Sequence, residues 1–297
     1  MAQIPSIGPI PSVFAHLPTF SFWSTLYDDT TGPLTWSITI NITHIRNATQ
    51  LITFGGKTFL VDPMLAPQGA YPGFPGTARA DIRNPTVELP CDINTLLQAD
   101  ALIVTHLHAD HWDEVAAKVV PKEKPIYVQN DQDAQILRGQ GFSQLTVLTD
   151  ESRLGEVTLR KTGGQHGSDR LYAIPAMAER MGDACGVIFQ HPQEKTLYLV
   201  GDTIWRDEVE SNFIAFQPDV VVLNAGFAHV IGFGAIIMGA EDVLKTHFVL
   251  PDAQIVAVHM EAINHCLLTR AALREYARDN QIAEYVRVPE DGETLTF

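Results

Sequence analysis

The apolar positions along the chain form short runs, many of them closed by glycine or by a polar residue. Runs of this length with such punctuation predict β-strands rather than helices, which need a longer and periodically interrupted pattern. The strands expected are 36–42, 50–54, 57–61, 101–104, 125–128, 145–148, 157–161, 185–189, 195–200, 219–224 and 254–258. The pair Gly55-Gly56 between two of these runs predicts a β-hairpin.

Helices are expected between several of these strands. The segments are 92–98, 113–119, 131–138, 240–248 and the amphipathic segment 269–279, for which Thr269 is a suitable N-cap. Two longer segments show little periodicity and are interpreted as loops. Residues 64–90 are rich in proline and glycine, and long loops of this kind in compact domains are often functional. The glycine-rich apolar segment 226–239 could line a substrate pocket or pack between sheet and helix, and both interpretations stay open.

The first 35 residues differ from the rest in composition. They contain five prolines and several aromatic residues, and no lysine or arginine occurs before Arg46. A secretory signal normally begins with positive charge. We therefore interpret residues 1–35 as an irregular N-terminal arm and residues 36–297 as the folded domain. The arm could close the mouth of a site or contribute to a contact between copies of the chain, that is, to a homo-oligomer.

Composition excludes some classes of partner. At 297 residues the chain is long enough for one large α/β domain or two small ones. A net charge of −15 argues against a broad nucleic-acid surface and against docking on anionic lipid. The three cysteines are scattered and odd in number, which favours a reducing compartment such as the cytoplasm. No apolar run approaches the length of a membrane span.

Four side chains that can bind metal follow the strand expected at 101–104. These are His106, His108, Asp110 and His111. In an extended segment, residues two apart point to the same side, so His106 and His108 can bind one cation together. Asp110 and His111 lie just beyond and can reach a second cation. A loop that is rich in histidine by chance is the alternative, but the spacing directly after a buried strand favours a metal site.

The segment HLHADH resembles the H-x-H-x-D-H signature of the metallo-β-lactamase superfamily of hydrolases. The resemblance covers residues 40–265. It implies an α/β fold, a four-layer αββα sandwich, with a two-metal site at one edge of the two sheets. The Asp62-Pro63 pair, the NP…LP segment within residues 84–90 and the helix after Met238 look similar to the branch of ascorbate-6-phosphate lactonase. That branch also resembles N-acyl-phosphatidylethanolamine phospholipase D.

The resemblance also implies the remaining ligands. His166 lies between glycines after a strand, Asp202 follows a glycine after a strand, and His259 follows the last buried strand. Taken alone, such residues are commonly loop histidines or turn residues. In the order of the family, His106, His108 and His166 would bind the first metal, and Asp110, His111 and His259 the second. Asp202 and a water or hydroxide would bridge the two.

Further residues are candidates for a role near the metals. Asp62 could orient a ligating histidine or simply cap its strand. His229 and Phe233 lie in the 226–239 loop and could contact substrate. His265 could contact substrate or begin the following helix.

The implied activity is hydrolysis of a small molecule. Nitrogen and oxygen ligands without thiolate suit two divalent ions of zinc, manganese or iron. The bridging hydroxide would cleave a lactone or ester, with Asp110 and Asp202 as the catalytic carboxylates and Asp110 also as a proton carrier. The alternatives are phosphodiester or phospholipid hydrolysis and, within the same fold, iron-dependent redox chemistry.

Overall fold

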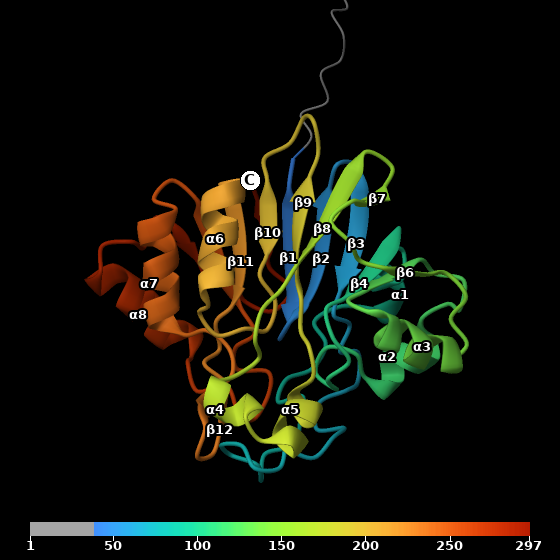
Figure 1. Cartoon of the computed structure of the whole chain (residues 1–297), viewed down its shortest axis with the longest axis horizontal. Helices are drawn as coiled ribbons and strands as arrows, with labels where there is room; N and C mark the ends of the chain where they lie inside the picture. Colours follow the sequence, from blue (N-terminus) through green and yellow to red (C-terminus); the bar gives the residue numbers. More distant parts are fainter. Residues whose placement is uncertain (1–38) are drawn as a thin grey trace, which may run out of the picture. The chain divides into compact units, whose positions relative to one another are not determined.

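The computed structural model describes residues 39–297, so the arm predicted for residues 1–35 lies outside the described part of the chain. Two seven-stranded mixed sheets form the centre of the structure (Figure 1). The first has the order β16-β1-β2-β3-β4-β5-β6. Its strands are β1 (Asn41–Arg46), β2 (Thr49–Phe54), β3 (Lys57–Val61), β4 (Ala101–Val104), β5 (Ile126–Val128), β6 (Leu145–Val147) and β16 (Thr294–Thr296).

The second sheet has the order β15-β14-β11-β10-β9-β8-β7. Its strands are β7 (Ser152–Leu154), β8 (Val157–Thr162), β9 (Gly186–Gln190), β10 (Leu197–Leu199), β11 (Val220–Asn224), β14 (Gln254–Val258) and β15 (Val286–Arg287). A separate small hairpin joins β12 (His229–Val230) and β13 (Gly234–Ala235). Side chains such as Phe54, Phe59 and Phe189 fill the space between the two large sheets.

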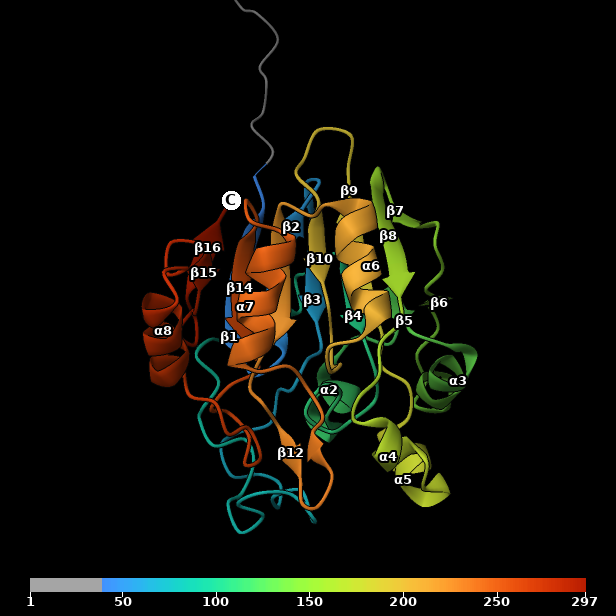
Figure 2. The same ribbon diagram turned by 60° about the vertical axis from the view of Figure 1, so that its left-hand side comes forward.

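Helices cover the outer face of each sheet, which completes four layers (Figure 2). The helices α1 (Ile93–Leu96), α2 (Glu114–Val119) and α3 (Asp131–Gly139) pack on the first sheet. The helices α6 (Asp207–Phe216), α7 (Ala240–Val249) and α8 (Arg270–Asp279) pack on the second. The αββα sandwich is therefore confirmed. Within residues 39–297, no helix combines the length and the apolar character needed to cross a membrane.

The ends of the strands bring distant parts of the sequence together. Within their sheets, β3 runs parallel to β4, and β10, β11 and β14 run parallel to one another, so their carboxyl ends meet at one edge of each sheet. The short helices α4 (Asp169–Tyr172) and α5 (Pro175–Met181) lie beyond this edge together with β12 (Figure 1, bottom).

Most predicted elements are present, with three corrections. The hairpin at Gly55-Gly56 is confirmed, and both glycines have positive φ (57° and 68°), as its tight turn requires. The Thr269 side chain caps α8 by accepting the Ala272 N–H at 3.1 Å. Of the first strand, expected at 36–42, residues 36–38 lie outside the described part; within that part the strand begins at Asn41, where pairing with β2 and with β16 from the far end of the chain begins. The segment 226–239 is not purely a loop, since it contains the β12–β13 hairpin.

The third correction concerns the segment before α8. His265 does not begin that helix, which starts at Arg270 after the Thr269 cap.

Candidate metal centre

The predicted ligands lie together at the edge where the parallel strands end. His106, His108, Asp110 and His111 follow β4, and His259 directly follows β14. Asp202 follows β10 by way of Gly201, whose φ is 76° and whose missing Cβ would lie 2.3 Å from the Cys185 carbonyl oxygen. Only glycine allows this close turn.

The seven predicted ligands form three groups whose donor atoms lie within 4.8 Å of one another. The groups are His106–His108–His166, His106–His111–Asp202 and Asp110–His111–His259. The first and third match the two ligand sets expected from the sequence, and Asp202 lies between them. All seven are buried except His108, which is partly exposed.

The spacing of the nitrogens suits cations between them. His106 Nε2 lies 3.0 Å from His108 Nδ1, and His111 Nε2 lies 3.1 Å from His259 Nε2. Two nitrogens bound tetrahedrally to one zinc ion are about 3.3 Å apart, since each Zn–N bond is about 2.0 to 2.1 Å. The arrangement therefore fits two metal positions side by side.

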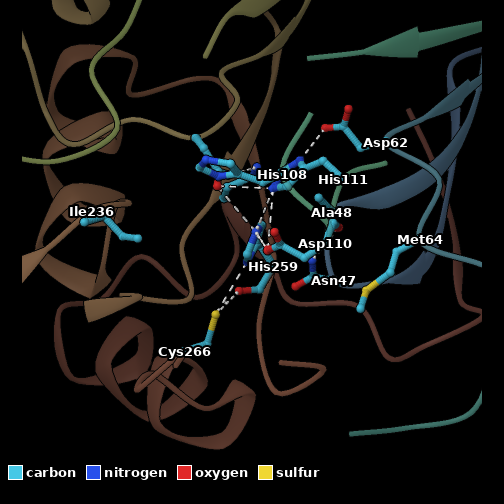
Figure 3. A network of polar contacts seen from close by, with 12 residues as sticks. Asn47, Ala48, Asp62, Met64, His108, Asp110, His111, Ile236, His259 and Cys266 are labelled. Atoms are coloured by element: carbon cyan, nitrogen blue, oxygen red, sulfur yellow. Dashed lines mark hydrogen bonds and ion pairs between the residues drawn. The ribbon is translucent and has the colours of Figure 1, made fainter. Parts of the chain in front are cut away.

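The opposite ring nitrogen of each histidine has its own partner. His111 Nδ1 lies 2.9 Å from Asp62 Oδ2, and His259 Nδ1 lies 3.5 Å from Cys266 Sγ (Figure 3). His166 Nδ1 donates to the Ile236 carbonyl at 2.8 Å.

The remaining two histidines follow the same rule. His108 Nε2 donates to the Arg180 carbonyl at 3.1 Å, and His106 Nδ1 lies 3.2 Å from Thr105 Oγ1. Such partners fix the ring and leave the other nitrogen to a metal. All five rings are thus held with one nitrogen toward the common centre, which is the arrangement a dinuclear site requires.

Asp62, which contacts the His111 ring, is itself held in place. Asp62 accepts the Thr105 N–H at 2.7 Å and the Thr105 hydroxyl at 2.8 Å, and its φ is 44°. His259 has a φ of 63°. Backbone in this region is strained for residues other than glycine and is concentrated at functional sites. The geometry therefore favours the orienting role of Asp62 over a strand cap.

Asp202 holds a central position in the cluster. Its Oδ2 lies 3.2 Å from His111 Nε2, 3.5 Å from His166 Nε2 and 3.6 Å from His259 Nε2. Its Oδ1 accepts the Asn224 side-chain N–H at 2.6 Å. Asn224 was not identified from the sequence, although a polar residue at the end of the buried strand 219–224 was a usable signal.

The charges at the site fit a cation. Burial and neighbouring histidines lower the pKa of His106, so its imidazole is neutral and free to ligate. Burial opposes ionisation of Asp202, but the nearby histidines outweigh it and hold the pKa of this carboxyl well below its usual range. For His111, burial is outweighed by Asp202, Asp110 and Asp62, which raise its pKa to about 10. A metal ion would supply the positive charge that these carboxylates attract.

A cavity of about 320 Å³ opens directly beside the cluster. His108, Asp110 and His166 form part of its lining. Its apolar walls come from the 64–90 segment, from α5 and from the β12–β13 hairpin. They include Phe74, Met177, Met181, Val230, Phe233 and Ile236.

Two of the three residues predicted to contact substrate lie at the cavity, and one lies away from it. Phe233 and His265 line the cavity, whereas His229 does not, because it alternates with Val230 along β12 and packs on Phe227 with ring centroids 4.4 Å apart. Burial lowers the pKa of His265 to about 4, so this imidazole is neutral at pH 7. The contribution of α5 to the cavity wall was not predicted, because no helix was expected between residues 161 and 185.

Comparison with known proteins identifies the family of this chain. Residues 57–260 match the family model described as the beta-lactamase superfamily domain. The chain belongs to the metallo-β-lactamase superfamily. It is a metal-dependent hydrolase of this superfamily.

Three relatives are similar over nearly their whole length. UPF0173 protein YddR of Bacillus subtilis (strain 168) is 43% identical over 259 residues, which is 87% of this chain and 100% of that protein. The crystal structure of isothiocyanate hydrolase from Delia radicum gut bacteria is 50% identical, with a TM-score of 0.85, over 86% of this chain and 99% of that one.

The third relative is a "possible metal-dependent hydrolase" from Veillonella parvula DSM 2008. Its crystal structure is 44% identical, with a TM-score of 0.86, over 87% of this chain and 100% of that one. None of the three is named for lactonase activity, and the placement beside ascorbate-6-phosphate lactonase stays a prediction.

Proposed function

We propose that this chain hydrolyses small isothiocyanates, R–N=C=S, with two divalent metal ions bound by the seven residues of the cluster. The observation that carries the proposal is the apolar cavity beside the metal ligands. Among the described lining residues, Arg180 is the only lysine or arginine, and its guanidinium donates to the Pro75 carbonyl at 2.9 Å. An uncharged substrate with an apolar substituent suits such a pocket. The relative that is 50% identical is named for this activity.

The donor set also supports the metals. Five imidazoles and two carboxylates without a thiolate favour zinc, manganese or iron. The metals, when bound, lower the pKa of water and polarise the substrate. The three cysteines, Cys91, Cys185 and Cys266, are free thiols, which supports the proposed cytoplasmic location.

The proposed reaction is the addition of one water to the isothiocyanate, followed by loss of the amine. One water adds to the central carbon, a C–O bond forms, and the C–N bond breaks, so that R–N=C=S and H₂O give R–NH₂ and O=C=S. Both protons of the water end on the nitrogen. Asp110 lines the cavity, and its Oδ2 lies 3.4 Å from His259 Nε2. Its carboxylate is therefore placed to take a proton from water and return it to the nitrogen. Phe233 and the methionines of α5 would hold the R group and exclude bulk water.

A substrate panel tests the proposal. With zinc or manganese bound, the wild type is expected to release amine and carbonyl sulfide from phenethyl and allyl isothiocyanate. The rate should exceed that for bis-p-nitrophenyl phosphate by about 100-fold or more, since Arg180, the one lysine or arginine of the described lining, donates to the Pro75 carbonyl. A lactone and a carboxylic ester complete the panel. Metal-free protein in an amine-free buffer is the control. Faster turnover of the phosphodiester would contradict the proposal. Faster turnover of the lactone would instead favour lactone or ester hydrolysis, the activity expected from the sequence, whose substrates are equally uncharged.

Phe233 is expected to set the preference for the R group. Phe233→Ala should raise KM for phenethyl isothiocyanate about 10-fold, because part of an apolar wall is lost, and change KM for the smaller allyl compound little. His229→Ala is the matched control, because His229 lies in the same hairpin but away from the cavity. Steady-state kinetics and metal analysis provide the measurement. An equal loss for both substrates with a lower Tm would show that Phe233 serves packing alone.

A further inference from the structure

His265 lies in a backbone segment that is held from several sides. The Asn264 side chain accepts the Phe74 N–H at 3.0 Å and donates to Thr77 Oγ1 at 2.9 Å. The Arg79 guanidinium donates to the carbonyls of Asn264 and Cys266, and the His265 carbonyl accepts the His229 N–H at 3.2 Å. The residues around position 265 are thus fixed by hydrogen bonds to the walls of the cavity.

The ring of His265 has no such partner. The residue is only 6% exposed, and its Nδ1 is buried without a hydrogen bond. Within residues 39–297, no hydrogen bond to Nε2 is present either, and this nitrogen is the accessible one in a residue that lines the cavity. The ring packs edge-to-face on Phe74, with centroids 4.9 Å apart. A buried polar ring without a partner is costly, and such groups call for an explanation.

Metal ligation does not explain it. His265 belongs to none of the three groups of converging donor atoms, although it shares the cavity with His108, Asp110 and His166. A rigid backbone, a free ring nitrogen and a place beside the reacting centre are what a hydrogen bond to substrate requires.

We propose that His265 is a catalytic residue whose Nε2–H donates a hydrogen bond to the nitrogen of the isothiocyanate. This inference rests on the proposed function. As the C–O bond forms, the C=N bond becomes single and negative charge develops on the nitrogen. The neutral imidazole stabilises this charge and keeps its own proton, and the two protons that the nitrogen gains come from water.

Two variants separate the hydrogen bond from packing. His265→Phe keeps a ring against Phe74 but removes the donor, whereas His265→Gln places an amide N–H near the position of Nε2. We expect His265→Phe to lower kcat on phenethyl isothiocyanate about 100-fold, the usual effect of losing one such donor. His265→Gln should stay within about 5-fold of the wild type. Metal content and Tm should be unchanged in both variants.

A binding measurement makes the test independent of turnover. The probe is O,S-dimethyl N-phenethyliminothiocarbonate, R–N=C(OCH₃)(SCH₃), an uncharged analogue of the addition product whose imine nitrogen accepts a hydrogen bond, titrated calorimetrically into the metal-loaded protein. Its Kd should rise about 10-fold in His265→Phe and little in His265→Gln. Wild-type kcat and Kd in His265→Phe would overturn the inference, as would equal losses of kcat and Tm in both variants. If the wild type hydrolyses no isothiocyanate, the proposed function fails, and the dependence of Kd on His265 still decides the inference.

Discussion

Asp202→Ala is expected to lower turnover by roughly 1,000-fold and to leave the purified chain with fewer than two metal ions. The Asp202 carboxylate is buried, and its Oδ2 lies within 3.6 Å of the Nε2 atoms of His111, His166 and His259. The two cations that we propose for these histidines would repel each other strongly in a buried site, and a carboxylate between them would offset that repulsion. The carboxylates of Asp62 and Asp110 also reach the cluster, but Asp62 contacts His111 from outside it and Asp110 belongs to the second ligand group.

Metal analysis, kinetics and thermal unfolding of the same preparation provide the measurement. Asp202→Asn is the matched variant, because it keeps the shape beside Asn224 and removes only the charge. The Asp202→Asn variant should also lose metal, which would show that the loss of metal and turnover results from removing the negative charge. Asp150→Ala, at an exposed aspartate away from the cluster, is the control. Wild-type activity in Asp202→Ala would show that the residue only forms the turn after β10.

Local signals explain why the core of the site could be predicted from the sequence. The run at 101–104 and the histidines after it are contiguous, and the strand period alone places His106 and His108 on one side. His166, Asp202 and His259 carry no local signal of comparable strength. They were predicted through the order of residues in the family, and the fold brings them to the same edge because their strands end there.

Long-range pairing explains most of what was missed. β16 has three residues and pairs with β1, about 250 positions away, so no local pattern announces it. The β12–β13 hairpin is equally short, and without it the alternation that turns His229 away and Val230 inward could not be recognised. The carbonyls of Arg180 and Ile236, which orient two candidate ligands, are backbone atoms and leave no trace in residue type.

Metal removal is expected to abolish hydrolysis and to lower the Tm by roughly 8 to 16 °C. Ions at about 1,000 times their Kd stabilise a protein by about 4 kcal/mol, and each kcal/mol shifts the Tm of a domain of this size by about 2 to 4 °C. The stability is lost because the polar atoms of the ligands converge in the interior. These ligands include the buried residues Asp110, His111, Asp202 and His259. Without cations, the cluster is left with buried carboxylates that only protonated imidazoles can balance.

Dialysis against a chelator, followed by stepwise addition of zinc or manganese, tests this prediction. Activity and Tm should recover together and reach their plateau at two ions per chain, as expected for the two ligand groups that share Asp202 between them. Magnesium is the control, because it prefers oxygen ligands and binds imidazole poorly. Recovery at one ion per chain would contradict the proposed dinuclear site, and a chelated protein with full activity would contradict metal-dependent hydrolysis at this cluster altogether.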